Sequence, residues 1–146
     1  MTMAPENPDF DADVRRAFGR QGMMRTLGAE IVALEPGRCT IAAPVRDATS
    51  QQHGFAHAGL GWTIGDSAAG FAAMSLMAPS EGVLTVEMKI NLLAPAAGDR
   101  LVAEGRVIRR GRRLLVVQSE VFGEDGSTRN HIATMLGTMS RAGRKS

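Results

Sequence analysis

One long, nearly uncharged stretch constrains the fold of this 146-residue chain more than any other segment. Residues 54–80 read GFAHAGLGWTIGDSAAGFAAMSLMAPS, in which only His57 and Asp66 can ionise. Two stripes follow the three-or-four spacing of helix faces, one mostly of larger apolar side chains and one of very small ones: Leu60, Ile64, Ala68, Phe71 and Ser75, and Gly61, Gly65, Ala69 and Ala73. Pro79 marks the end, because proline cannot continue a helix. The pattern predicts one helix over residues 58–77, apolar enough to be wrapped by a sheet.

Asp66 lies in the middle of this predicted helix, although aspartate is a poor helix former and is costly to bury. One explanation is structural, with the carboxylate paired or hydrogen-bonded to backbone. The other is a catalytic carboxylate in a desolvated cleft, where burial raises its basicity. The helix start favours the second, because no Ser, Thr, Asp or Asn stands near Ala58 to cap the first N–H groups. Free N–H groups there can hold an oxyanion, which together with a carboxylate base suits acyl transfer.

Alternating apolar and polar residues predict strands on both sides of the helix. Two are expected before it and four after it: 29–34, 38–44, 83–93, 101–108, 114–122 and 131–140. In the third we expect one apolar face: Leu84, Val86, Met88, Ile90 and Leu92. Short turns between successive strands imply an antiparallel sheet. With a short helix over 11–21, the predicted fold class is α+β, an antiparallel sheet wrapped around one long central helix.

The same residues carry a resemblance to a known family. His57-Ala58-Gly59, followed by Asp66 nine residues after the histidine, resembles the "HGG…D" signature of the hotdog-fold acyl-CoA thioesterases, and is most similar to their PaaI-like (phenylacetate-degradation-type) branch. The strand over residues 83–97, VLTVEMKINLLAPAA, with its proline-ended exit, is similar to the family's next strand. The likeness covers roughly residues 27–140. It departs at Ala58, where the family often has Gly, and at Gln51, where it usually has Asn.

The resemblance implies roles for individual residues. The Ala58 N–H, with Gly59, would polarise the thioester carbonyl, and Asp66 would activate water or attack directly. Thr85 would orient the water and Gln51 would lie nearby, although Thr85 is equally explained as an ordinary strand residue. His57 either binds substrate or fixes the first helical turn, Trp62, Phe71 and Met74 would shape the acyl pocket, and Arg110 and Arg112 would contact CoA phosphates unless their turn is only a solvated hairpin. The resemblance also implies a homodimer joined through the strand over 83–93, often doubled to a homotetramer, with active sites at the dimer interface.

Composition limits the other classes of function. The net charge is only +2, aromatic content is 4%, and no tyrosine is present, so we expect no nucleic-acid partner. The basic residues around Gly111 suit a small polyphosphate ligand better: Arg109, Arg110, Arg112 and Arg113. A single cysteine, Cys39, and an N-terminus unlike a signal peptide favour the cytoplasm. The Gly/Ala-rich helix carries Asp66 and lacks flanking anchors, so no membrane span is expected. His53 and His131 have no metal-ligand spacing, so neither a metal nor another cofactor is expected.

We therefore expect one hotdog thioesterase domain over residues 23–140, preceded by a tail and short helix over 1–22 and followed by a basic tail over 141–146. The expected activity is hydrolysis of an acyl-CoA with an aryl or medium-chain acyl group. One alternative is a non-catalytic acyl-CoA-binding module on the same fold. Another is a hotdog dehydratase or hydratase, which would need a His paired with Asp or Glu, a motif absent around Asp66.

Overall fold

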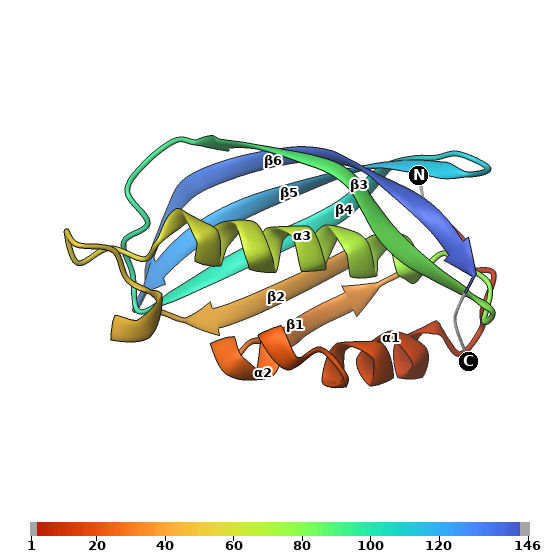
Figure 1. Cartoon of the computed structure of the whole chain (residues 1–146), viewed down its shortest axis with the longest axis horizontal. Coiled ribbons are helices and arrows are strands. Elements are labelled where there is room, and N and C mark those ends of the chain that lie inside the picture. The colour runs from red at the N-terminus through yellow and green to blue at the C-terminus, as the bar shows by residue number, and fades with distance from the viewer. Residues whose placement is uncertain (1–2, 144–146) are drawn as a thin grey trace.

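A six-stranded antiparallel sheet wraps around one long helix in the computed structural model, which describes residues 3–143 (Figure 1). The strand order is β1-β2-β4-β5-β6-β3. The elements, in chain order, are α1 (Phe10–Gly19), α2 (Gly22–Leu27), β1 (Glu30–Glu35), β2 (Arg38–Pro44), a 3₁₀ turn (Asp47–Thr49), α3 (Ala58–Met74), β3 (Glu81–Leu92), β4 (Arg100–Arg110), β5 (Leu114–Asp125) and β6 (Thr128–Gly143). The predicted α+β hotdog class is confirmed.

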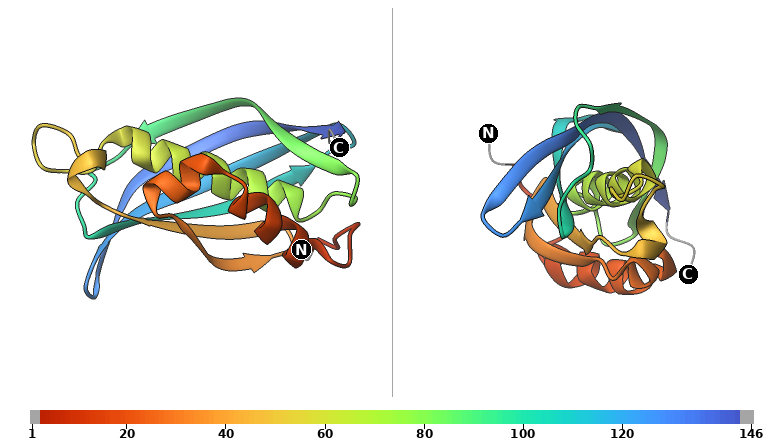
Figure 2. Two further views of the ribbon diagram at one scale, coloured as in Figure 1. Left: turned by 60° about the horizontal axis from the view of Figure 1, so that its bottom comes forward. Right: turned by 90° about the vertical axis from the view of Figure 1, so that its left-hand side faces the viewer.

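Helix α3 runs along the concave face of the sheet and forms the centre of the core, as the end-on view in Figure 2 shows. Its stripe of small residues permits close approach: a Cβ on Gly105 of β4 would lie 2.4 Å from the Ala69 backbone nitrogen. Ser119 of β5 donates a buried hydrogen bond to the Gly65 carbonyl at 2.6 Å. Backbone contact of this kind fixes the position of α3 along its axis, and so the place of Asp66 relative to the strands.

The helix ends earlier than expected, at Met74 rather than residue 77. The Ser75 hydroxyl donates to the Ala72 carbonyl at 2.7 Å and accepts the Gly37 N–H at 2.8 Å. A short polar side chain that bonds to nearby backbone in this way competes with continued helix. The last turn therefore closes against the β1–β2 turn.

Strand β3 does not carry the single apolar face predicted for it, and that prediction is wrong. The β3–β6 register shifts between Thr85 and Glu87, so Val86 is an extra residue in the ladder. A one-residue bulge moves the following side chains to the opposite face. As a result Leu84 and Val86 are 63% and 57% exposed, whereas Val83, Met88 and Ile90 pack on the core.

The two ends of the chain also differ from expectation. Helix α2 was not predicted, and α1 and α2 lie along the β1 side of the molecule (Figures 1 and 2). Residues 3–9 make defined contacts, since Asn7 is buried and its side chain donates to Asp13 at 3.2 Å. Strand β6 continues to Gly143, so the expected basic tail begins inside a strand, and residues 144–146 lie outside the described part.

Candidate active site

The loop before α3 is a tight hairpin that presents the start of the helix. Ser50 and Ala56 form an isolated antiparallel bridge, and the Gln51 N–H donates to the Phe55 carbonyl at 2.9 Å. The Gln51 side-chain oxygen accepts the His53 N–H. Gln51 and Ala58 line the same cavity, and the NH₂ group of the Gln51 side chain can act only as a donor.

The first turn of α3 is capped by a histidine. His57 Nδ1 accepts the Gly59 N–H at 2.8 Å, and the His57 carbonyl accepts the Leu60 N–H at 2.9 Å. This bond supports the structural alternative for His57, and a neutral ring held so carries its proton on Nε2. It also uses the Gly59 N–H that was expected to assist substrate binding. The Ala58 N–H has no hydrogen-bond partner within residues 3–143, which leaves it available for an oxyanion.

A cavity of about 290 Å³ opens beside Ala58. Its walls come from the loop before α3, from α3 itself, from the ends of β3, β4 and β6, and from residues 94–96. The buried part of the wall is apolar and includes Leu101, Ile132 and Ala133. The expected pocket residues Trp62, Phe71 and Met74 do not line it. Phe55 and Leu101 were missed because nothing in the sequence separates them from ordinary core or loop residues.

Asp66 lies in a second, smaller hollow of about 100 Å³. The Thr85 hydroxyl donates to Asp66 Oδ1 at 2.8 Å, so the structure brings together these two predicted residues. Phe71 and Gln21 also line the hollow. Gln21, from the link between α1 and α2, was missed because no local pattern of residues indicates that this link reaches α3. Burial raises the pKa of Asp66 above its ordinary value, and the Thr85 hydrogen bond lowers it in part.

The bulge in β3 allows Thr85 to face Asp66 while the charged residues that follow it stay out of the core. Val83 and Thr85 lie before the extra residue and face α3, with Val83 and Thr85 both lining the Asp66 hollow. Without the bulge, an inward Thr85 would place Glu87 and Lys89 inward as well. With it, the strand turns Met88 and Ile90 toward the core instead. The irregular strand therefore supplies a polar contact at Asp66 without burying charge further along.

The two halves of the expected site are separate within one chain. Ala58 and Asp66 are eight residues apart on α3, which is about 12 Å along the helix axis. The cavity at Ala58 does not include Asp66, and the hollow at Asp66 does not include Ala58. A single thioester carbonyl cannot touch both groups of the same chain.

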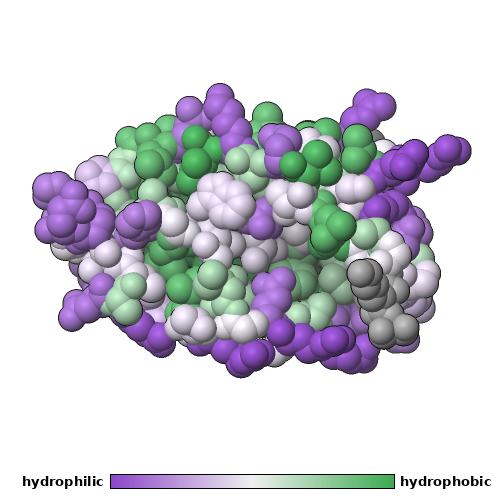
Figure 3. Space-filling model, in the orientation of Figure 1, coloured by the Kyte–Doolittle hydropathy of each residue, from purple (hydrophilic) through white to green (hydrophobic). Residues whose placement is uncertain are grey.

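An exposed surface lies between Ala58 and Asp66 on α3 and along the edge strand β3. Trp62, on α3 between Ala58 and Asp66, is 37% exposed. Strand β3 is an edge strand whose neighbour on one side is β6, and it ends in the exposed Leu92 and Leu93. Figure 3, in the orientation of Figure 1, shows hydrophobic groups gathered along the β3 side of this face. An exposed apolar edge strand is a pairing surface for another chain.

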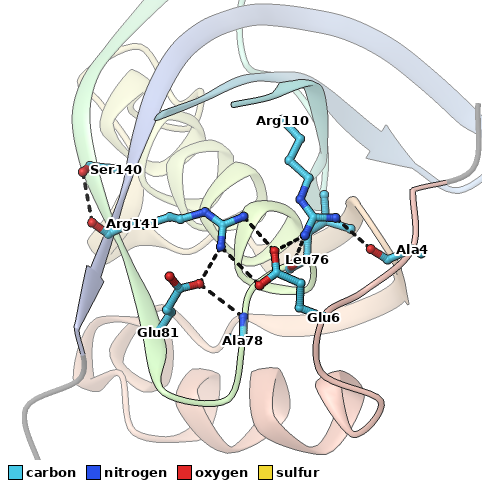
Figure 4. Close-up of polar contacts among 8 residues, drawn as sticks. All are labelled: Ala4, Glu6, Leu76, Ala78, Glu81, Arg110, Ser140 and Arg141. Atoms are coloured by element: carbon cyan, nitrogen blue, oxygen red, sulfur yellow. Dashed lines mark hydrogen bonds and ion pairs between the residues drawn. The ribbon is translucent and has the colours of Figure 1, made fainter. Parts of the chain in front are cut away.

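The turn that carries Arg109, Arg110, Arg112 and Arg113 lies at the C-terminal end of α3, where Arg110 contacts Leu76 (Figure 4). Ala58 lies at the other end of the helix. Arg110 donates to the Leu76 carbonyl at 3.0 Å and the Ala4 carbonyl at 2.8 Å, and it pairs with Glu6. Arg141 pairs with the same Glu6 at 3.0 Å and with Glu81 at 2.6 Å. The predicted phosphate contact of Arg110 therefore competes with an existing structural role. Arg112 lies exposed in the turn between β4 and β5.

Within residues 3–143, no group of three His, Cys, Asp or Glu side chains is placed to hold a metal ion. None of the helices described is both long and apolar enough to cross a membrane.

The antiparallel sheet around a single helix, with a half-buried carboxylate on that helix and a free N–H at its start, defines a hotdog-fold protein with the parts of an acyl-transfer site. The thioesterase superfamily profile matches residues 53–129, which include α3 and strands β3 to β5, and the chain belongs to this superfamily. The family supports thioester hydrolysis as the general activity.

Individual relatives agree with this assignment. A thioesterase family protein from Silicibacter pomeroyi has a crystal structure that matches with a TM-score of 0.90 and 42% identity, over 92% of this chain and 99% of that one. The 1,4-dihydroxy-2-naphthoyl-CoA hydrolase of Listeria monocytogenes is 27% identical over 103 residues, 70% of this chain and 84% of that protein. The E. coli PaaI protein of the phenylacetic acid degradation operon matches with a TM-score of 0.83 over 94% of this chain and 96% of that one. At 20% identity, PaaI shows the shared fold alone.

Proposed function

We propose that this protein hydrolyses acyl-CoA thioesters in a site formed by two copies of the chain. The observation that carries the proposal is the Asp66 carboxylate, half-buried on α3, hydrogen-bonded by Thr85 and with no cation paired to it among the described residues. A structural aspartate at this depth is normally paired or fully bonded. Asp66 instead faces a hollow large enough for a water molecule or a reacting atom.

In this mechanism the Ala58 N–H of one subunit and Asp66 of the partner subunit act on the same thioester. Positions 58 and 66 are equally far from residue 62 along α3. A two-fold axis near Trp62, with the β3 edges paired and the two α3 helices antiparallel, would therefore bring Ala58 of one subunit opposite Asp66 of the partner subunit. The Ala58 N–H, with the Gln51 NH₂ beside it, polarises the carbonyl oxygen. Asp66 either takes a proton from the attacking water or attacks the carbonyl carbon itself. The carbon–sulfur bond then breaks, and the CoA thiolate leaves and takes up a proton. When water attacks, the free acid forms in this step. When Asp66 attacks, a water molecule then hydrolyses the acyl–Asp66 anhydride, which releases the acid and restores the carboxylate.

The test is an assay of the purified protein with a panel of acyl-CoAs and a reagent that detects free thiol. We expect release of CoA by the wild type and a loss of about a hundred- to ten-thousand-fold in kcat for Asp66→Asn, the usual range for removal of a general base. Binding of CoA and the oligomeric state should not change. An Asp66→Asn variant that hydrolyses acyl-CoA at the wild-type rate would contradict the mechanism.

The alternative of a non-catalytic acyl-CoA-binding module predicts a different result. Such a module would bind acyl-CoA without releasing thiol, and Asp66→Asn would leave binding unchanged. The dehydratase alternative has less support, because the hydrogen-bond partner of Asp66 in the described chain is Thr85 rather than a histidine.

A further inference from the structure

The cavity beside Ala58 carries information on the acyl group, an inference that rests on the function proposed above. We infer that the natural acyl group is apolar and free of hydroxyl substituents, such as a phenylacetyl or octanoyl group. Three features of the cavity support this: the end of the substrate that it takes, the chemistry of its wall and its volume.

The acyl group, rather than the pantetheine arm, suits the cavity. Ala58, which holds the free N–H for the carbonyl oxygen, forms part of its wall, so whatever is attached to that carbonyl lies next to it. Pantetheine carries two amides that need hydrogen-bond partners in a buried site. The polar side chains Gln52 and His57 also line the cavity and are exposed, so the exposed part of the cavity suits the polar pantetheine arm.

The deep wall offers no partner for a hydroxyl group. Leu101 is 0% exposed, Ile132 3% and Ala133 1%, and none has a polar side chain. Nearby backbone groups are already bonded: the Ala96 carbonyl accepts the Ala56 N–H at 3.0 Å, and the Ile132 carbonyl accepts the Leu93 N–H at 2.8 Å. A hydroxyl carried into this space would lose its hydrogen bonds to water without replacement, which disfavours binding.

The volume indicates the size of group that the cavity can take. A space of about 290 Å³ far exceeds the roughly 10–15 Å³ that holds one water molecule, so a group of several carbons fits inside. Phenylacetyl and octanoyl groups are of this kind. A dihydroxynaphthoyl group, named for the Listeria relative, is larger and brings two hydroxyls to an apolar wall. The two proteins should therefore differ in substrate although their folds are related.

The experiment compares matched substrates that differ by one hydroxyl: phenylacetyl-CoA with 4-hydroxyphenylacetyl-CoA, and hexanoyl-CoA with 6-hydroxyhexanoyl-CoA. We expect each hydroxyl to lower kcat/KM by about 10- to 100-fold, the discrimination an apolar pocket achieves. Equal kcat/KM within both pairs would overturn the inference while leaving thioester hydrolysis intact. Absence of hydrolysis with every acyl-CoA would overturn the proposed function, and this inference with it.

A cavity-filling variant tests the location independently. Ala94 lines the cavity and is itself exposed, so Ala94→Leu should fold normally while reducing the space. It should lower kcat/KM at least tenfold for octanoyl-CoA but less than threefold for acetyl-CoA, at the scale of a few methylenes in a pocket. Ala12→Leu, at an exposed position on α1, is the matched control and should change neither. Equal losses for acetyl-CoA and octanoyl-CoA in Ala94→Leu would place the acyl group elsewhere.

Discussion

At the scale of a single residue, burial of the Asp66 carboxylate lowers the stability of the fold and raises the basicity of the carboxylate. Burial raises its pKa above the ordinary 3.8, so the folded chain binds this proton more tightly than the unfolded chain does. Its contribution to stability therefore falls as pH rises from 3.8 through the raised pKa, and the full penalty is present at neutral pH. Asp66→Asn should raise Tm at pH 7 by about a degree or more and lose this advantage below pH 4. A lower Tm at pH 7, measured by calorimetry, would instead indicate a structural Asp66.

Thr85 sets where Asp66 titrates. Its hydroxyl stabilises the charged carboxylate, and its loss should raise the pKa of Asp66 further. Thr85→Ala should therefore move the acidic limb of the kcat/KM profile to higher pH, whereas Thr85→Ser should keep the wild-type limb. A purely structural Thr85 would alter Tm and leave the position of the limb unchanged.

At the scale of elements, we expect the arginines of the β4–β5 hairpin to divide into those that bind CoA and one that holds the structure. The hairpin lies at the C-terminal end of α3, where Arg110 bonds the Leu76 carbonyl. In the proposed dimer with antiparallel α3 helices, we expect this end to lie beside the partner subunit's substrate loop, within reach of CoA phosphates. Replacing Arg109, Arg112 and Arg113 by Gln should raise KM for acyl-CoA more than it lowers kcat, because remote phosphates contribute binding alike in ground and transition states.

The control for this variant is Arg110→Gln, which should lower Tm because Glu6 and the Leu76 carbonyl lose a partner. The KM effect of the triple variant should shrink as salt rises. It should also be absent with a truncated acyl-pantetheine thioester. If the triple variant raises KM equally for acyl-CoA and for the truncated thioester, the hairpin has no role in binding phosphate.

The elements themselves were largely predictable because their signals are local. The spacing of Leu60, Ile64 and Ala68 indicates a helix wherever it packs, and alternation with Gly-containing turns indicates antiparallel strands. The bulge at Val86 was not predictable, since it depends on the pairing of β3 with β6. The cap at His57 was missed because histidine is not among the preferred capping residues. Arg110 was assigned to substrate because its partner, Glu6, lies 104 positions away in the sequence.

At the scale of the whole molecule, the single tryptophan reports on assembly. Trp62 is 37% exposed in the isolated chain and lies where we place the two-fold axis. Dimerisation should bury it and shift its fluorescence to shorter wavelength as protein concentration rises. Light scattering at the same concentrations should give a dimer or a tetramer. A stable monomer at micromolar concentration would remove the shared site.

A site shared between two chains predicts that two differently mutated, inactive subunits regain activity when they form a dimer together. Ala58→Pro removes the N–H of the first helical residue, a position where proline is well tolerated, and His57 already has the extended ψ of 140° that a residue before proline adopts. Ala58→Pro and Asp66→Asn should each be inactive alone. A dimer containing one of each keeps one site intact, with Ala58 from one subunit and Asp66 from the other.

Random exchange makes half the dimers mixed, each with one working site of two, so co-refolding equal amounts should restore about a quarter of wild-type activity. If both residues acted within one chain, every site in the mixture would carry a lesion and no activity would return. Subunit exchange is checked with a differently tagged wild-type pair, so that the absence of rescue counts against the two-chain site rather than against mixing.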